Sequence, residues 1–164
     1  MIYCLYKKIW RWFFVYKNSL VHYLTKILVD LMFYGGILCC AAIPFFMPSL
    51  ALFLGYSPDV VIPYIVILMS SGLCALFIVW QLKAMFGTLL KGNPFVEKNV
   101  GCLRRCSVAS ILISAIYLVK ISIWFTIASS VIVIIFALLG LFCLTLKDVF
   151  KQAVAYKEEN DWTV

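Results

Sequence analysis

The chain has 164 residues, of which 65% are hydrophobic and only 13% are charged, and its mean hydropathy is +1.06. A water-soluble domain of this composition would expose large apolar patches, so the composition excludes a soluble globular protein and predicts an integral membrane protein. The formal net charge is +7. Because each helical span needs about 20 apolar residues, the chain has room for four spans and little else.

The first 26 residues predict an amphipathic helix that lies on the membrane surface. At helical spacing, basic and polar residues gather on one face and large apolar residues on the other, with tryptophans on the flanks. The segment lacks the small-residue cleavage site of a signal peptide, so we expect it to be retained. Anionic lipid headgroups are its expected partner. The residues assigned to the membrane interface are Lys7, Lys8, Trp10, Arg11 and Trp12.

Two uncharged stretches predict the first two spans, one between Asp30 and Asp59 and the other between Asp59 and Lys83. Pro44 and Pro48 lie toward the outer end of the first stretch, where a freed carbonyl needs another partner. They predict a kink or an early end of the helix. Residues 49–58 would then lie along the outer surface before the second helix begins.

The last apolar run, residues 106–146, is interrupted only by Lys120 and is long enough for a helical hairpin. A lysine at the bilayer centre costs about 2.5–3.5 kcal/mol on insertion scales, whereas near a helix end its stem reaches the interface. We therefore expect span three to begin near Leu103 and to end near Lys120. Span four follows from about Ala128 to Leu146, after a turn within residues 126–130. Lys120 and Asp59 are the only charges expected on the outer side, and they form a candidate ion pair.

All Lys and Arg residues except Lys120, 13 of the 14, fall before span one, between spans two and three, or after span four. Basic residues collect on the cytoplasmic side, so both termini and the central loop are predicted to be cytoplasmic. The expected location is the bacterial cytoplasmic (inner) membrane. Only helices satisfy the backbone of so short a chain in lipid. The sequence therefore predicts an all-α membrane four-helix bundle with an interfacial N-terminal helix (1–26), a four-span domain (27–148) and a cytosolic helical tail (149–164).

The sequence holds little that predicts catalysis, so we expect no enzyme, no catalytic or metal-ligating residues and no cofactor. The single histidine, His22, lies on the polar face of the surface helix. Cys102 and Cys106 are either a redox or metal pair or plain thiols, and two thiols without further ligands form an incomplete zinc site. A stripe on span three predicts close helix packing in preference to a substrate path. The stripe consists of Ser107, Ser110, Ser114 and Tyr117.

The central loop and the tail are expected to be helical and to meet in the cytosol. Gly92 is predicted to end the helix of span two, Asn93 to cap the next helix, and Pro94 to lie in its first turn. In the tail, one apolar group is expected to pack on this loop. The group consists of Val149, Phe150, Ala153 and Val154.

Residues 91–106, KGNPFVEKNVGCLRRC, and residues 149–164, VFKQAVAYKEENDWTV, resemble two boxes of a bacterial family of short four-span membrane proteins, a domain of unknown function. That family carries a GNPF..EN-like loop before span three and closes with a VF.QA...KEENDLT-like box. Its members are often encoded beside a small helix-turn-helix regulator. The resemblance therefore implies such a regulator as a cytosolic partner.

The leading hypothesis is a non-enzymatic membrane protein whose cytosolic face, residues 91–105 and 149–164, binds a transcription regulator. The acidic end of the tail would attract the regulator's basic DNA-binding domain and compete with DNA phosphates for it. Direct contact with nucleic acid is not expected, and a second copy of the chain is another candidate partner. The alternative is a small transport or peptide-immunity component that uses residues 49–58 and a kinked span one. The predicted partner-binding residues are Asn93, Pro94, Phe95, Glu97, Asn99, Gln152, Lys157, Glu158, Glu159, Asn160 and Asp161.

Overall fold

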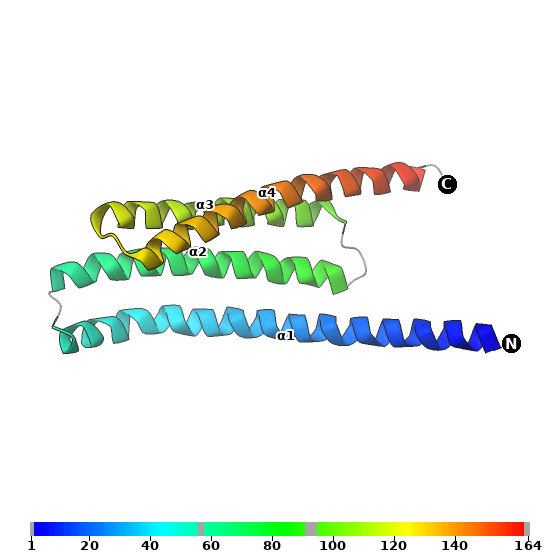
Figure 1. Cartoon of the computed structure of the whole chain (residues 1–164), viewed down its shortest axis with the longest axis horizontal. Coiled ribbons are helices and arrows are strands. Elements are labelled where there is room, and N and C mark those ends of the chain that lie inside the picture. Colours follow the sequence, from blue (N-terminus) through cyan, green and yellow to red (C-terminus); the bar gives the residue numbers. More distant parts are fainter. Residues whose placement is uncertain (1, 56–57, 91–94, 163–164) are drawn as a thin grey trace.

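The computed structural model describes the backbone of residues 2–55, 58–90 and 95–162, and the side chains of residues 23–55, 61–89, 95–157 and 159. Over these residues the chain forms four helices, α1 (Ile2–Phe53), α2 (Pro58–Leu90), α3 (Glu97–Ile123) and α4 (Ile127–Trp162) (Figure 1). Each helix is long and apolar enough to cross a membrane. The all-α class and the four predicted spans are thereby confirmed.

The helices pack in chain order, with α1 against α2, α2 against α3, and α3 against α4. Within the described residues, α1 makes no direct backbone approach to α3 or α4. Both chain ends, the end of α2 and the start of α3 lie together at what we call the termini end, on the right of Figure 1. The end of α1, the start of α2 and the turn between α3 and α4 lie at the opposite turn end.

The core lies between α2, α3 and α4, where α3 has a neighbour on two sides. Ile78, Cys106, Ala109 and Ile113 form its centre, with Ile132, Phe136 and Cys143 of α4 packed against them. Lipid tails are as apolar as the helices, so no hydrophobic force drives the helices together. Close packing replaces that force, and small residues allow it. A Cβ on Gly140 would lie 2.8 Å from Ile111 Cγ1 and 3.4 Å from the Ser107 carbonyl oxygen.

The serine stripe of α3 packs as predicted. Ser107, Ser110 and Ser114 are buried, and the Ser114 hydroxyl donates across to the Val133 carbonyl of α4 at 3.1 Å. The Ser110 hydroxyl donates to the Cys106 carbonyl of its own helix at 2.9 Å. These bonds satisfy polar atoms that lipid cannot hydrate.

Two sequence predictions about helix ends were wrong. α1 continues through Pro44 and Pro48 to Phe53, so residues 49–53 extend the helix instead of lying along the outer surface. A transmembrane helix tolerates proline where local adjustment satisfies the freed carbonyls. α3 begins at Glu97, with Val96 at the N-cap in an extended conformation, so its first turn does not include Pro94. Asn93 and Pro94 themselves lie outside the described residues.

α1 also runs without interruption across residue 26. The described backbone therefore places no boundary between the predicted surface helix and span one, and the interfacial placement stays a prediction. At the turn end, α3 stops at Ile123 and α4 begins at Ile127, close to the predicted limits. The Ser129 and Ser130 amides donate to the Thr126 carbonyl and close the first turn of α4.

Candidate functional site

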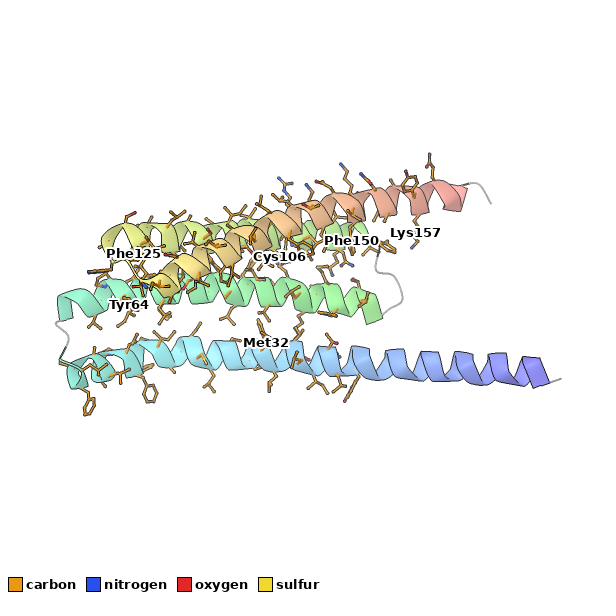
Figure 2. The ribbon with its side chains drawn as sticks, in the orientation of Figure 1. Met32, Tyr64, Cys106, Phe125, Phe150 and Lys157 are labelled. Atoms are coloured by element: carbon orange, nitrogen blue, oxygen red, sulfur yellow. The ribbon has the colours of Figure 1, made fainter. Side chains whose placement is uncertain are left out.

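The loop before α3 and the extension of α4 meet at the termini end, as the sequence predicted. The Phe95 and Phe150 rings lie 5.5 Å apart between centroids and are tilted by 50°. Figure 2 shows Phe150 on the part of α4 that leads away from the bundle toward Lys157. Val154 is buried one turn further along, whereas Val149 is exposed. The loop and the tail therefore form one surface, although Val149 does not pack beneath it as expected.

Four exposed residues of α4 follow one face of this extension: Val149, Gln152, Tyr156 and Glu159. Their spacing of three or four residues places them in one row on a helix. Val149 is 56% exposed and Tyr156 is 68% exposed. We call this row the tail stripe.

Helix lengths predict that the tail stripe lies beyond the reach of lipid tails. α3 measures about 27 Å from Arg105 to Ile123 at about 1.5 Å per residue, close to the 30 Å or so of a hydrocarbon core. Gly140 of α4 packs on Ser107 of α3. The two helices are antiparallel, so the residue three positions after Gly140, Cys143, is level with the residue three positions before Ser107, Arg104. Tyr156 then lies about 20 Å farther along α4. A hydrocarbon core that spans α3 only from Arg105 to Ile123 would therefore leave the tail stripe in water.

The structure separates the predicted partner-binding residues into three groups. Phe95, Glu97, Gln152, Lys157 and Glu159 have exposed side chains, and Lys157 and Glu159 each take part in a further interaction. Asn99 is only 2% exposed and accepts a 2.8 Å hydrogen bond from the Thr88 hydroxyl, so it joins α3 to α2 and does not face a partner. The remaining predicted side chains lie outside the described set. They are Asn93, Pro94, Glu158, Asn160 and Asp161 in the loop and tail, and Lys7, Lys8, Trp10, Arg11 and Trp12 at the membrane interface.

A buried lysine cluster at the turn end was not predicted. Lys120 lies near the end of α3, as expected, but its side chain is only 4% exposed, because its ammonium ends among side chains of α2 and α4. Its ammonium donates to the Ser129 hydroxyl of α4 at 2.7 Å and to the Tyr64 hydroxyl of α2 at 3.1 Å. The ammonium also lies 4.6 Å from the centre of the Tyr64 ring and 5.7 Å from that of Tyr117.

Only part of this cluster had a signal in the sequence. Tyr117 precedes Lys120 by three residues and therefore shares its helix face. Tyr64 reaches it through tertiary packing (Figure 2 labels this residue on α2). The Asp59 side chain lies outside the described residues, so its pairing with Lys120 stays a prediction. A cation held by two hydroxyls and two rings joins three helices at one point.

Residues 20–164 match the model of a family described as a protein of unknown function, DUF2975. The chain belongs to the DUF2975 family. The match includes all of α2, α3 and α4 and most of α1, and it confirms the resemblance at the level of the family. Neither the comparison with curated proteins nor the comparison with solved structures finds a match.

In this DUF2975 protein an ion pair joins α1 to α2. The Lys83 ammonium lies 2.8 Å from a carboxylate oxygen of Asp30, and both side chains are about one-third exposed. The same ammonium lies 5.3 Å from the centre of the Phe33 ring and 5.2 Å from that of Tyr34. Because α1 packs on α2 alone in the described part of the chain, this pair fixes the register of the outermost helix.

The paired thiols of α3 are oriented for packing in this DUF2975 chain. Cys102 and Cys106 are each 2% exposed, and Cys106 Sγ lies 4.0 Å from the Ile78 carbonyl oxygen of α2. Arg104 and Arg105 are both exposed, away from these thiols. Among the residues with described side chains, no group of three or more His, Cys, Asp or Glu side chains gathers where it could hold a metal ion.

Proposed function

We propose that this DUF2975 protein is a non-enzymatic membrane-anchored binding protein whose cytosolic surface takes a soluble protein partner. The surface consists of the loop before α3 and the α4 extension, with the tail stripe and Phe95 as its contact residues. The membrane spans would hold this surface, and with it the partner, at the cytoplasmic leaflet.

One observation carries the proposal: Val149 and Tyr156 are exposed on a part of α4 that runs past the level of Arg104. Tyr156 is 68% exposed and lies about 20 Å past that level along α4. The Phe95–Phe150 contact at 5.5 Å fixes α4 against the loop, so the stripe has a set orientation. Tyrosine is enriched among residues that dominate binding energy at protein interfaces. The exposed tyrosine therefore favours a binding surface over a purely structural extension.

The family resemblance supports a small helix-turn-helix transcription regulator as the partner. Glu159 is an exposed anion on the tail stripe, and Glu158 and Asp161 are its sequence neighbours. A DNA-binding surface is basic, so these carboxylates would attract it and compete with DNA phosphates. The regulator would then be held at the membrane and kept off DNA.

Co-purification of the full chain with the regulator encoded beside it tests this proposal. Deletion of residues 157–164 should abolish recovery of the regulator. Tyr156→Ala should weaken the complex about tenfold, since removal of an interface tyrosine commonly costs more than 1 kcal/mol. Lys151→Ala is the control, because Lys151 is exposed on α4 but lies about 140° around the helix from Tyr156.

Undiminished recovery after the deletion would reject the tail as the binding surface. Equal losses for Tyr156→Ala and Lys151→Ala would reject the stripe. A reporter fused after Val164 should be cytoplasmic, and a periplasmic reporter would remove the surface from its proposed partner.

The transport alternative used residues 49–58 and a kinked span one. α1 continues through Pro44 and Pro48 to Phe53, so residues 49–53 belong to the helix and less of the outer segment is left to form a site. We therefore propose the binding function alone.

A further inference from the structure

Three cations surround an open glycine at the start of the α3 span. Gly101 follows Lys98 by three residues and precedes Arg104 and Arg105 by three and four. Residues at these spacings are neighbours on a helix surface, so all three cations border Gly101. A Cβ built on Gly101 would meet nothing within 4 Å. The surface of α3 beside Gly101 is therefore open, and basic side chains border it.

The direction of helical side chains concentrates this charge over the glycine. Side chains on an α-helix tilt toward its N-terminus, so Arg104 and Arg105 lean over the turn that contains Gly101. All three cations are exposed. None of them forms an ion pair with a carboxylate whose side chain the structure describes, including the neighbouring Glu97. Glu97 precedes Gly101 by four residues and also borders it, so the rim carries three positive charges and one negative charge, with a net charge of +2.

The site lies where the headgroups of one leaflet meet the hydrocarbon. Below the arginines, the outward face of α3 is apolar and exposed over Val108, Leu112 and Val119 as far as Ile123. The exposed Trp124 follows at the far end, about 28 Å from Arg105 along the helix axis. An arginine at one end and a tryptophan at the other is the pattern of a span whose ends meet the two interfaces.

We propose that Lys98, Arg104 and Arg105 around Gly101 form a binding site for the headgroup of an anionic phospholipid. The two guanidinium groups match a phosphate in bidentate geometry. The Lys98 ammonium adds a point charge, and the open glycine admits the glycerol. The acyl chains lie against the apolar face that runs from Val108 toward Ile123. The site is separate from the tail stripe, so it does not depend on the proposed partner function.

Lipid retention by the full chain in mixed bilayers of phosphatidylglycerol and phosphatidylcholine tests this site. The two lipids retained after purification are counted by mass spectrometry. A basic residue near the surface contributes about fivefold to anionic lipid binding, so the double variant Arg104→Gln/Arg105→Gln should lower the preference for phosphatidylglycerol about 25-fold. The control Lys151→Gln/Lys157→Gln removes the same charge from exposed positions on the α4 extension, outside the predicted surface helix, and should keep the preference.

Further variants and a competition experiment distinguish this site from other causes of the lipid preference. Arg104→Lys/Arg105→Lys keeps the charge but not the bidentate geometry, so its preference should fall between those of the unmodified chain and the glutamine variant. An unchanged preference in the lysine variant would show attraction by charge alone and would overturn the proposal. Equal losses in the glutamine and control variants would show a diffuse attraction in place of a site. Displacement of phosphatidylglycerol by soluble glycerol phosphate would assign the site to a soluble anion, which would also overturn it.

Discussion

Removal of the Ser129 hydroxyl tests how the buried Lys120 is stabilised. Ser129→Ala deletes the shortest bond of the ammonium, at 2.7 Å, and leaves a cation that is 4% exposed with the Tyr64 hydroxyl as its remaining described hydrogen-bond acceptor. Hydrogen bonds to charged groups contribute about 1.5–3 kcal/mol in soluble proteins, whereas interhelical bonds in membranes average about 0.6 and reach about 1.7. Because this cation is almost fully buried, we expect a loss of about 1.5 kcal/mol.

The lysine itself should be less costly to replace than its partner. Lys120→Met removes the charge together with its desolvation penalty, so the free energy of unfolding should change by about 1 kcal/mol or less in either direction. In the Lys120→Met background, Ser129→Ala should cost almost nothing. The coupling energy between the two positions is then about 1.5 kcal/mol.

Unfolding of the full chain in mixed micelles, followed by circular dichroism as denaturing detergent increases, measures all four members of this cycle. Ser130→Ala is the matched control, because the Ser130 hydroxyl makes no hydrogen bond to any residue with a described side chain. If Ser129→Ala costs the same with and without the lysine, the hydroxyl does not stabilise the ammonium. If Lys120→Met costs more than 3 kcal/mol, the cation has an ionic partner, and Asp59 is the first residue to test.

Two further predictions use the same unfolding measurement. Asp30→Lys and Lys83→Asp should each lower the free energy of unfolding by about 1 kcal/mol, the order expected of a partly exposed ion pair, and the double exchange should recover most of the loss. Additive losses in the double variant would show that the two charges do not interact. Gly140→Ala should lower the free energy of unfolding by about 1–3 kcal/mol, because the added Cβ would lie 2.8 Å from an atom of α3. In the control Gly87→Ala the added Cβ has no atom within 4 Å, so this variant should be stabilised by up to about 1 kcal/mol through helix propensity. A stabilising Gly140→Ala would mean that α3 and α4 are not in close contact.

Much of the fold follows from where the charges lie along the chain. Charged residues mark the ends of the apolar stretches, and α2 begins at Pro58 where the second stretch was expected to start. The turn near residues 124–126 was located because one apolar run was too long for a single span. The two proline positions were misread, since a proline weakens an isolated helix but is tolerated within a transmembrane one.

The candidate surface was predicted in part, because side-chain direction depends on tertiary contacts. Phe95 and Phe150 were placed together by sequence and do meet at 5.5 Å. Val149 was predicted to pack on the loop, but it is exposed in the structure. Asn99 was predicted to bind a partner, but it is buried. Asn99 lies in the first turn of α3, and Val149 lies 13 residues before the end of α4, so the periodicity of the sequence alone did not define which face packs inward at either position.

The sequence by itself determined that this protein has four membrane spans. An uncharged apolar stretch predicts a span when its length as a helix matches the thickness of the bilayer. The tertiary structure alone decided which polar groups meet inside it. Lys120 finds Tyr64 through the packing of α2 on α3, and Asp30 finds Lys83 through the packing of α1 on α2. Such partners are distant in sequence, and the register that joins them depends on where small residues such as Gly36 and Gly72 let the helices touch.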